Sequence, residues 1–354
     1  MLKQLKRYIA LLLAMVMVCA MALTGCAGKK GTSENTASDE EPYSRDIFAM
    51  DTYMTVSAYG DAGEKAVDAA VKEINRLDAL LSTGKASSEV SELNASNGGK
   101  LSADTNALMD AALDLYESTD HVFDITIYPV MKLWGFTDQN YKVPSEGDLK
   151  AALTLVDAST LDYNKAKKTV AFTVDGTQID FGGIAKGYTS ATVAQLYKDY
   201  GVTSGLVNLG GNVQTLGKKP DGSDFTVAIE SPEKDGGYLG MLKTSDKAVI
   251  TSGGYERFFE KNGKTYHHIM NPETGYPAES GLASVTIVSK DGTLADALST
   301  LLYVMGEKKA VEFWNQSSED FDIILFTKDN KLIVSGGIAD SFTSEYNIEV
   351  IKKD

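Results

Sequence analysis

The strand-like and helix-like segments of this 354-residue chain do not alternate along the sequence, and this order constrains the fold more than any other feature. β-branched or alternating residues predict strands at 51–59, 225–229, 284–289, 321–327 and 332–335. Apolar residues at helical spacing predict helices at 62–81, 106–116, 189–200 and 293–306. Strict alternation would favour a doubly wound parallel sheet, whereas clustered strands joined by short turns favour antiparallel pairing. We therefore expect an α+β fold: a single domain with largely antiparallel mixed sheets flanked by helices.

Polar residues sharpen the expected boundaries of these elements. Asp61, with Glu64 three residues later, resembles a capping box at the start of the first helix. Thr293 is a suitable N-cap for the last helix. Asp329-Asn330 separates the last two strands, which predicts a hairpin turn between them.

The first 25 residues have the pattern of an export signal. Positive charges precede an apolar run over residues 8–23, which is shorter than the roughly 20 residues of a membrane-spanning helix. The following Leu23-Thr24-Gly25-Cys26 resembles a bacterial lipobox, in which the cysteine is lipidated and becomes the first residue of the mature protein. We therefore expect a lipoprotein signal peptide at 1–25 and a lipid on Cys26. An ordinary short membrane anchor is the alternative.

The next segment, 26–42, is rich in Ser, Thr, Glu and Gly and has no aliphatic residue larger than alanine after its cysteine. This composition is typical of a flexible tether. It would join the lipid to a folded domain over residues 43–354. The lipid would hold that domain at a bacterial cell membrane, on the extracytoplasmic face.

Charge and cysteine content exclude several classes of function. The formal net charge of −15 argues against a nucleic-acid partner. The only cysteines, Cys19 and Cys26, lie in or next to the export signal, so the mature domain would have no disulfide, thiolate metal site or thiol nucleophile. With only three histidines in the chain, a metal would have to be bound by oxygen, which favours Mg²⁺, Ca²⁺ or Mn²⁺.

Asp296 and Thr300 are the first candidate metal ligands. On the helix predicted at 293–306 they are four residues apart, so their side chains project from the same face. A carboxylate and a hydroxyl, completed by carbonyl or phosphate oxygens, suit Mg²⁺. We expect Asp296 to be exposed and separate from the core. Alternatively, Asp296 could stabilise the helix N-terminus, and Thr300 could pack or bond to the backbone.

Three glycine-rich segments could line a binding site. In 179–188 (IDFGGIAKGY), a strand-like lead enters a glycine turn before a helix whose N-terminus would favour an anion, and Lys186 could neutralise a phosphate. The segments 208–212 (NLGGN) and 251–255 (TSGGY) could add loops to the same pocket. Ordinary turns between strands are the alternative for all three.

Histidine and aromatic residues supply further candidates. His267 and His268 precede a turn-forming Asn-Pro pair, and a histidine of near-neutral pKa can move a proton. A structural histidine bonded to a carbonyl is the alternative. The segment 123–136 (FDITIYPVMKLWGF) contains Trp134 and could form an aromatic wall, although core packing is the commoner use of such residues.

Taken in order, these segments resemble the FAD:protein FMN transferase (ApbE-like) family. The resemblance covers about residues 45–305, from Met50-Asp51-Thr52 through the glycine-rich segments to ADALST at 295–300. It implies an ApbE-like fold and a Mg²⁺-dependent enzyme that takes FAD as its substrate. Such an enzyme passes FMN to a threonine hydroxyl of an acceptor protein and releases AMP.

The resemblance also implies roles for individual residues. Asp296 and Thr300 match metal ligands, with the carbonyl of Gly183 as a third. His268 matches the position of a base for the incoming threonine. The flavin-contacting positions are matched by Met50, Trp134, Gly135, Phe136, Asp180, Lys186, His268 and Ile269.

The sequence departs from the family pattern at two positions. Asp51 stands where the family often has glycine, and Gly84 stands where an aromatic residue is common. Flavin stacking near Gly84 would therefore need another aromatic residue.

Three functions remain open from the sequence. The first is the FMN transferase, and the second is a Mg²⁺-dependent FAD pyrophosphatase in which water replaces the acceptor hydroxyl. The third is a flavin-binding or solute-binding lipoprotein without catalytic activity.

Overall fold

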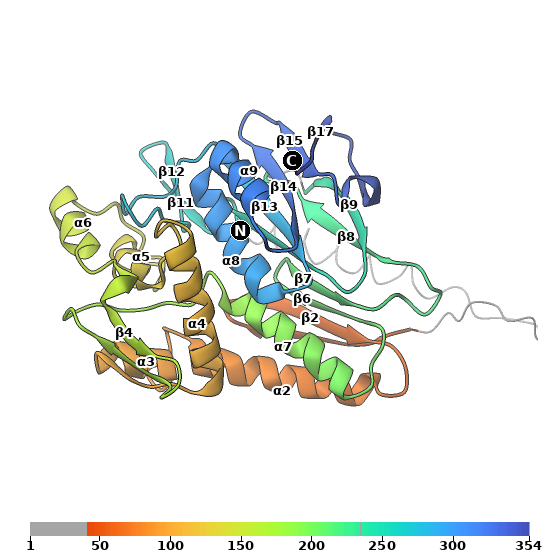
Figure 1. Ribbon diagram of the computed structural model, residues 1–354, viewed down its shortest axis with the longest axis horizontal. Coiled ribbons are helices and arrows are strands. Elements are labelled where there is room, and N and C mark those ends of the chain that lie inside the picture. Colours follow the sequence, from red (N-terminus) through yellow and green to blue (C-terminus); the bar gives the residue numbers. More distant parts are fainter. Residues whose placement is uncertain (1–40, 234–235, 354) are drawn as a thin grey trace, which may run out of the picture. The chain divides into compact units, whose positions relative to one another are not determined.

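The computed structural model describes residues 41–233 and 236–353, which form a single compact unit built around one large sheet (Figure 1). Within this part of the chain, the sheet has nine strands and all neighbours are antiparallel except the last pair. In spatial order the strands are β1 (Tyr43–Ala49), β2 (Thr52–Ala58), β6 (Gly205–Leu209), β7 (Asn212–Leu216), β10 (Ala248–Gly253), β13 (Leu282–Ser289), β14 (Phe321–Thr327), β15 (Leu332–Ser335) and β17 (Ile348–Ile351).

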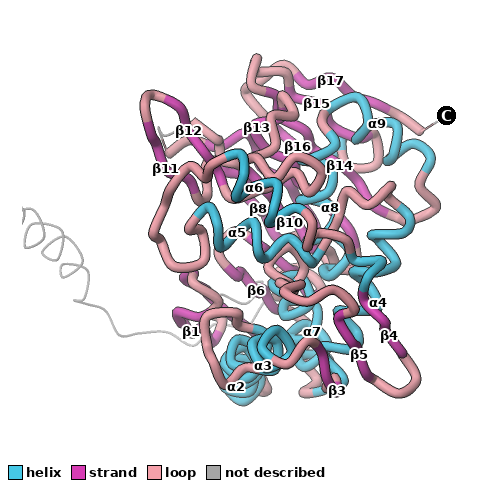
Figure 2. Tube along the Cα trace, turned by 90° about the vertical axis from the view of Figure 1, so that its left-hand side faces the viewer, coloured by secondary structure: helices cyan, strands magenta, loops and turns pink. Residues whose placement is uncertain are grey.

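Three smaller sheets flank the large one (Figure 2). The first contains β3 (Gly98–Lys100), β5 (Thr169–Phe172) and β4 (Leu161–Asn164). The second contains β16 (Phe342–Thr343), β9 (Tyr238–Thr244) and β8 (Phe225–Glu230). The third is the hairpin of β11 (Phe258–Lys261) and β12 (Lys264–His267).

The described helices vary from one to five turns. The α-helices are α2 (Gly63–Leu81), α3 (Glu89–Ala95), α4 (Ala103–Ser118), α5 (Tyr128–Trp134), α6 (Glu146–Leu153), α7 (Ala185–Asp199), α8 (Gly292–Met305) and α9 (Glu307–Gln316). Short 3₁₀ turns lie at Ile125–Ile127, Ala158–Thr160 and Ala339–Ser341. The α+β prediction, with largely antiparallel sheets, is confirmed.

The details of the predicted elements are partly right. The hairpin at Asp329-Asn330 is present, and Asn330 has the positive φ (66°) that such a turn favours. The capping box at Asp61 is wrong, because the N-cap of α2 is Ala62, whose side chain cannot accept a hydrogen bond. Thr293 is also not a cap: α8 begins one residue earlier, and Asp291 accepts hydrogen bonds from the first free amides.

Close packing of α7 on α8 fixes the centre of the molecule. A β-carbon on Gly187 would lie 2.1 Å from the carbonyl oxygen of Gly292 and 2.5 Å from the Cβ of Asp296. Only glycine permits this approach, so the start of α7 lies directly against the first turns of α8.

The predicted signal peptide, Cys26 and most of the predicted tether lie outside the described residues. Among the residues that are described, no helix has the length and apolar character needed to cross a membrane.

Candidate functional site

Asp296 on α8 is buried and accepts a hydrogen bond from the start of α7. Its Oδ2 lies 2.7 Å from the backbone nitrogen of Gly187, and the residue is only 4% exposed. The expectation of an exposed carboxylate is therefore wrong. Asp296 satisfies an N-terminal amide of a neighbouring helix rather than of its own. Burial raises the pKa of Asp296, while the nearby Lys186 ammonium and the Gly187 amide act in the opposite direction.

Thr300 lies one turn further along α8 and contacts two other elements. Its hydroxyl is 3.3 Å from the Oγ of Ser252 on β10. Gly183, in the turn before α7, is its neighbour on the other side, because a β-carbon there would lie 3.8 Å from Thr300 Cγ2. The structure thus brings Gly183, Thr300 and Asp296 together at the contact of α7 with α8.

These residues fit a hard divalent cation. One carboxylate, one hydroxyl and a nearby backbone segment are oxygen donors of the kind that Mg²⁺ prefers, and the remaining ligands would be water or substrate phosphate. No group of three or more His, Cys, Asp or Glu side chains in the described part of the chain offers a competing site.

The segment that carries Asp180 is held by buried hydrogen bonds. Asn94 on α3 donates its Nδ2 to the carbonyl of Ile179 (2.9 Å) and accepts from the Ile179 amide (2.7 Å). Asp180 then accepts from the amide of Gly182 at 2.7 Å, which closes the glycine turn. The strand predicted for this lead is absent: residues 177–181 have no regular secondary structure and pair with no sheet. Burial raises the pKa of Asp180, and Arg257 acts against this shift.

His268 follows β12 and is bonded to the backbone of Arg257. Its Nδ1 lies 3.2 Å from the Arg257 carbonyl, and its own amide donates to the same oxygen at 3.0 Å. Because a carbonyl only accepts, Nδ1 carries the proton and Nε2 keeps a free lone pair. Desolvation lowers the pKa of His268 to about 3, and the positive charges of Arg257 and Lys186 act in the same direction. The imidazole is therefore neutral at physiological pH.

His267 is a structural histidine bonded to a backbone carbonyl, which was the alternative considered for His267 and His268. It is buried, and its Nε2 lies 3.1 Å from the carbonyl of Ala278. Ile269, which follows His268 in the sequence, is also buried. Its carbonyl accepts a hydrogen bond from the amide of Ala278.

The aromatic residues at the end of α5 belong to the core and form no open wall. Trp134 is fully buried and donates its Nε1 to the carbonyl of Gly275 at 2.8 Å, while Phe136 is 1% exposed. Gly135 between them has φ 79° and ends α5 in a left-handed cap. Core packing, which the sequence analysis named as the commoner use of such residues, is what the structure shows for these two rings.

Met50 lies at the tip of the β1–β2 hairpin. Both turn residues, Met50 and Asp51, have positive φ (48° and 59°), which explains why glycine suits this turn. The amide of Met50 donates to Asp78 on α2 (3.2 Å), and its sulfur accepts from Thr189 on α7 (3.8 Å). Met50 is thus tied to the helix that carries Lys186. Near Gly84, the hydroxyl of Tyr128 donates to the carbonyl of Thr83 at 3.4 Å, which places an aromatic residue beside that position.

In the segment 208–212 the two glycines form an ordinary turn, but Asn212 at its end is buried and lowers the pKa of Asp296. Gly210 and Gly211 connect β6 to β7 as a two-residue hairpin, and both have positive φ. The segment 251–255 instead leads from β10 into the site, because Ser252 reaches Thr300 from it.

Sequence reasoning missed two charged residues of this site, Glu256 and Arg257. Both directly follow the segment 251–255 (TSGGY), in which only the glycines drew attention. Glu256 is accessible to solvent, yet protein surrounds it so closely that desolvation raises its pKa to about 7. Lys186 opposes that shift, while the negative charges of Asp296 and Glu230 add to it. The site therefore combines acidic and basic side chains within electrostatic reach of one another.

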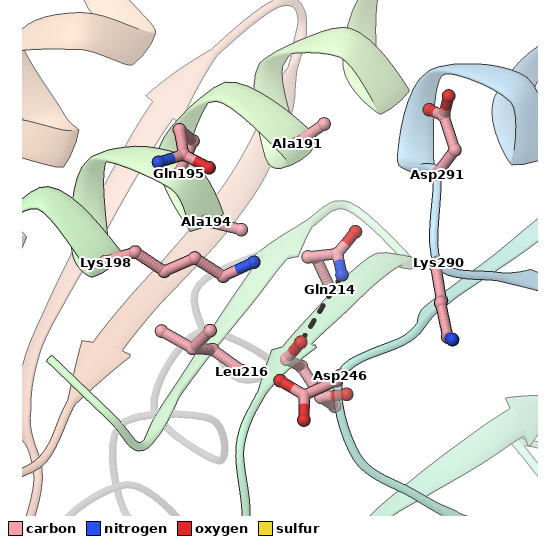
Figure 3. Close-up of a pocket in the computed structure, with 10 residues that line it drawn as sticks. Ala191, Ala194, Gln195, Lys198, Gln214, Leu216, Asp246, Lys290 and Asp291 are labelled. Atoms are coloured by element: carbon pink, nitrogen blue, oxygen red, sulfur yellow. Dashed lines mark hydrogen bonds between the residues drawn. The ribbon is translucent and has the colours of Figure 1, made fainter.

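Two cavities found in the described residues lie elsewhere. One, of about 430 Å³, lies between α7 and β7 and is lined by residues such as Gln214, Lys198 and Asp291 (Figure 3). The other, of about 580 Å³, lies among α4, α8 and α9. Neither is lined by a predicted site residue.

Comparisons with known proteins concern the chain as a whole rather than single site residues. The model of the ApbE family matches residues 50–325. An FAD:protein FMN transferase of Klebsiella pneumoniae is 32% identical, with 84% of this chain and 93% of the relative covered. One from Treponema pallidum is 31% identical, with 92% and 93% covered. The crystal structure of an ApbE protein from Thermotoga maritima superposes with a TM-score of 0.79 at 29% identity, covering 84% of this chain and 98% of that one.

Proposed function

The chain belongs to the ApbE family and is a flavin transferase, and from this premise we propose that it transfers FMN from FAD to a threonine hydroxyl of an acceptor protein, releasing AMP. The observation that carries the proposal is the convergence of oxygen donors, a lysine and a neutral histidine around the start of α7. Asp296 is bonded to Gly187, Thr300 adjoins Gly183, and the Lys186 charge acts on both Asp296 and His268.

The diphosphate of FAD would lie against the start of α7. Lys186 supplies a positive charge there, and the glycine turn before the helix allows a phosphate to approach the backbone. Asp296, Thr300 and the carbonyl of Gly183 would hold Mg²⁺, which neutralises charge on the diphosphate when it is bound. Phosphoryl-type transfer needs such alignment and charge neutralisation more than covalent assistance.

His268 would act as the base for the acceptor. Its Nε2 takes the proton from the threonine hydroxyl, and the threonine oxygen forms a bond with the phosphorus of the FMN half. The bond between that phosphorus and the bridging oxygen breaks, and the bridging oxygen leaves with AMP. The Nδ1–H bond to the Arg257 carbonyl keeps the accepting nitrogen free during this step.

One assay tests this proposal against the two other functions. The full chain is incubated with FAD, Mg²⁺ and an acceptor protein, and the products are separated by mass. Covalent FMN on the acceptor together with AMP supports the transferase. Free FMN and AMP without a modified acceptor would identify a pyrophosphatase, and unchanged FAD would identify a binding protein.

We also propose that the protein is a lipoprotein at the extracytoplasmic face of a bacterial cell membrane. The support is the sequence alone: the signal at 1–25, Cys26 at the cut and the polar tether over 26–42. Replacing Cys26 with Ala is expected to move the protein from the membrane fraction to the soluble fraction. Unchanged membrane attachment would contradict the lipid anchor.

A further inference from the structure

Arg257 connects two parts of the site that are far apart in the sequence. It lies in the bend that leads into β11. Its Nη2 donates to the carbonyl of Phe136 at 2.6 Å, across 121 residues of sequence. That carbonyl belongs to the loop after α5, where Gly135 and its neighbours are the predicted flavin-contacting residues.

The backbone of the same residue holds His268. The β11–β12 ladder pairs Phe258 with His267, so Arg257 and His268 are the next pair beyond it. The Arg257 carbonyl accepts from the His268 amide at 3.0 Å and lies 3.2 Å from His268 Nδ1. The ring is therefore oriented by a backbone oxygen that belongs to the same residue whose side chain is anchored at Phe136.

Of the nearby cations, Arg257 has the largest effect on the pKa of His268. The positive groups around the imidazole are Arg257 and Lys186, and both oppose its protonation, as does the preceding residue His267 to a smaller extent. Asp180, from the glycine turn, faces Arg257 as its negative counterpart. The guanidinium thus has neighbours in three separate segments of the site.

We propose that Arg257 is a positioning residue: its guanidinium anchors the loop after α5, and its carbonyl orients His268 so that Nε2 stays free to accept a proton. The proposal rests on the proposed function, in which His268 is the base. It gives Arg257 no contact with the reacting atoms. A planar guanidinium suits the task because it can bind a carbonyl in a fixed direction and keep its charge at every relevant pH.

The test compares Arg257→Met and Arg257→Lys with a matched control, Arg45→Met. Arg45 is an exposed arginine on β1, and its ion pair with Asp68 lies outside the site. The first readout is the titration of His268 followed by NMR in the full chain labelled at histidine. The chain has only three histidines, and a His268→Gln sample assigns the signal. The second readout is kcat and KM for FAD from pH 5 to 8.

We expect Arg257→Met to raise the pKa of His268 by about one pH unit, because a nearby positive charge is lost. We expect kcat to fall about tenfold or more, since a misplaced base costs rate, while KM for FAD changes less. Because the pKa of His268 is about 3 in the native chain and stays below 5 in this variant, the loss of kcat should be the same from pH 5 to 8. Arg257→Lys keeps the charge, so its His268 should titrate as in the native chain, although kcat still falls.

Each result decides a separate question. If the native chain transfers FMN and Arg257→Met has native kcat and a native His268 titration, the positioning role is overturned. If the native chain transfers no FMN, the proposed function fails, and the NMR titration still reports whether Arg257 controls His268. If Arg257→Met does not fold, Arg257→Lys decides: native kcat in that variant contradicts a role for the planar guanidinium.

Discussion

At the scale of single residues, the site depends on groups that serve structure and chemistry together. The carboxylate of Asp296 closes the N-terminus of α7 and is also the proposed metal ligand. Helical spacing was enough to predict that Asp296 and Thr300 share one face of a helix. It could not predict the partner of Asp296, because Gly187 lies 109 residues away and only the packing of two helices brings it there.

Asp296→Asn separates these two roles. The amide oxygen can still accept from Gly187, so we expect the fold to be retained, but the charge needed for a divalent cation is lost. Mg²⁺ at 100 times its dissociation constant should stabilise the native protein by about 2.7 kcal/mol and leave Asp296→Asn unchanged. Thermal unfolding with and without Mg²⁺ measures this difference.

Asp296→Ala is the contrasting variant. It removes the acceptor as well, which leaves a buried amide unpaired at a cost of about 1–3 kcal/mol. Equal Mg²⁺ stabilisation of the native and Asn proteins would contradict the metal site.

Glu256 makes stability depend on pH. Because desolvation raises its pKa to about 7, the folded state prefers the protonated carboxyl. Its stabilising contribution is therefore complete below the unfolded pKa of about 4.5 and is lost as pH rises through about 7. We expect Glu256→Gln to unfold like the native protein at pH 4 but to be more stable at pH 8. The side chain is accessible to solvent, so we expect a gain of only about 1 kcal/mol. Urea unfolding at both pH values tests this, and an equal difference at the two would contradict it.

At the scale of elements, the contact of α7 with α8 is the critical one. The sequence predicted both helices, although α7 begins four residues earlier than expected, and it identified the glycine turn before α7. It could not show that Gly187 meets Gly292 or that Trp134 is a core residue. Both facts depend on which elements become neighbours. Cap prediction failed for a related reason, since the first free amides of α8 are satisfied by Asp291, two residues before the predicted Thr293.

Gly187→Ala is expected to separate the two helices. Its methyl group would lie 2.1 Å from the carbonyl oxygen of Gly292, so the backbone must move. We expect a loss of about 1–3 kcal/mol and a weaker response to Mg²⁺. Thermal unfolding measures both.

A matched control for that variant is Gly147→Ala in α6. A β-carbon on Gly147 would meet only Ser145 Oγ, at 3.9 Å, and alanine favours a helix by about 0.5–1 kcal/mol over glycine. The control should therefore be slightly stabilised. Similar losses in the two variants would rule out a specific effect at the helix contact.

At the scale of the whole molecule, the clustering of strands was sufficient to predict the α+β class and the antiparallel sheet. The strand order was not predictable, because β2 pairs with β6 and skips every element between them. The role of Arg257 was not predictable for the same reason. It depends on contacts with Phe136 and His268, which come from different parts of the chain. Residue types identified the candidate chemistry, and long-range packing decided which candidates meet.

A variant of Asn94 measures how much such long-range hydrogen bonds contribute to the free energy of unfolding. Its amide bonds both backbone groups of Ile179, 85 residues away, just before Asp180. We expect Asn94→Ala to cost about 1–3 kcal/mol, because buried backbone groups lose their partners. Asn75→Ala, which removes only an exposed bond to Val71 within α2, should change stability little. Urea unfolding of both variants provides the comparison, and equal effects would contradict a special role for Asn94.

The pairing of β2 with β6 has a consequence for how the chain is made. The first hairpin leaves the ribosome long before its partner strand, and Met54 has no ladder neighbour until Leu209 has been synthesised. Contacts so distant in sequence form slowly, and the large sheet stays incomplete until the chain has been made beyond Leu209. A polypeptide in that state can be threaded through a narrow translocation channel, which a chain that folded early could not pass.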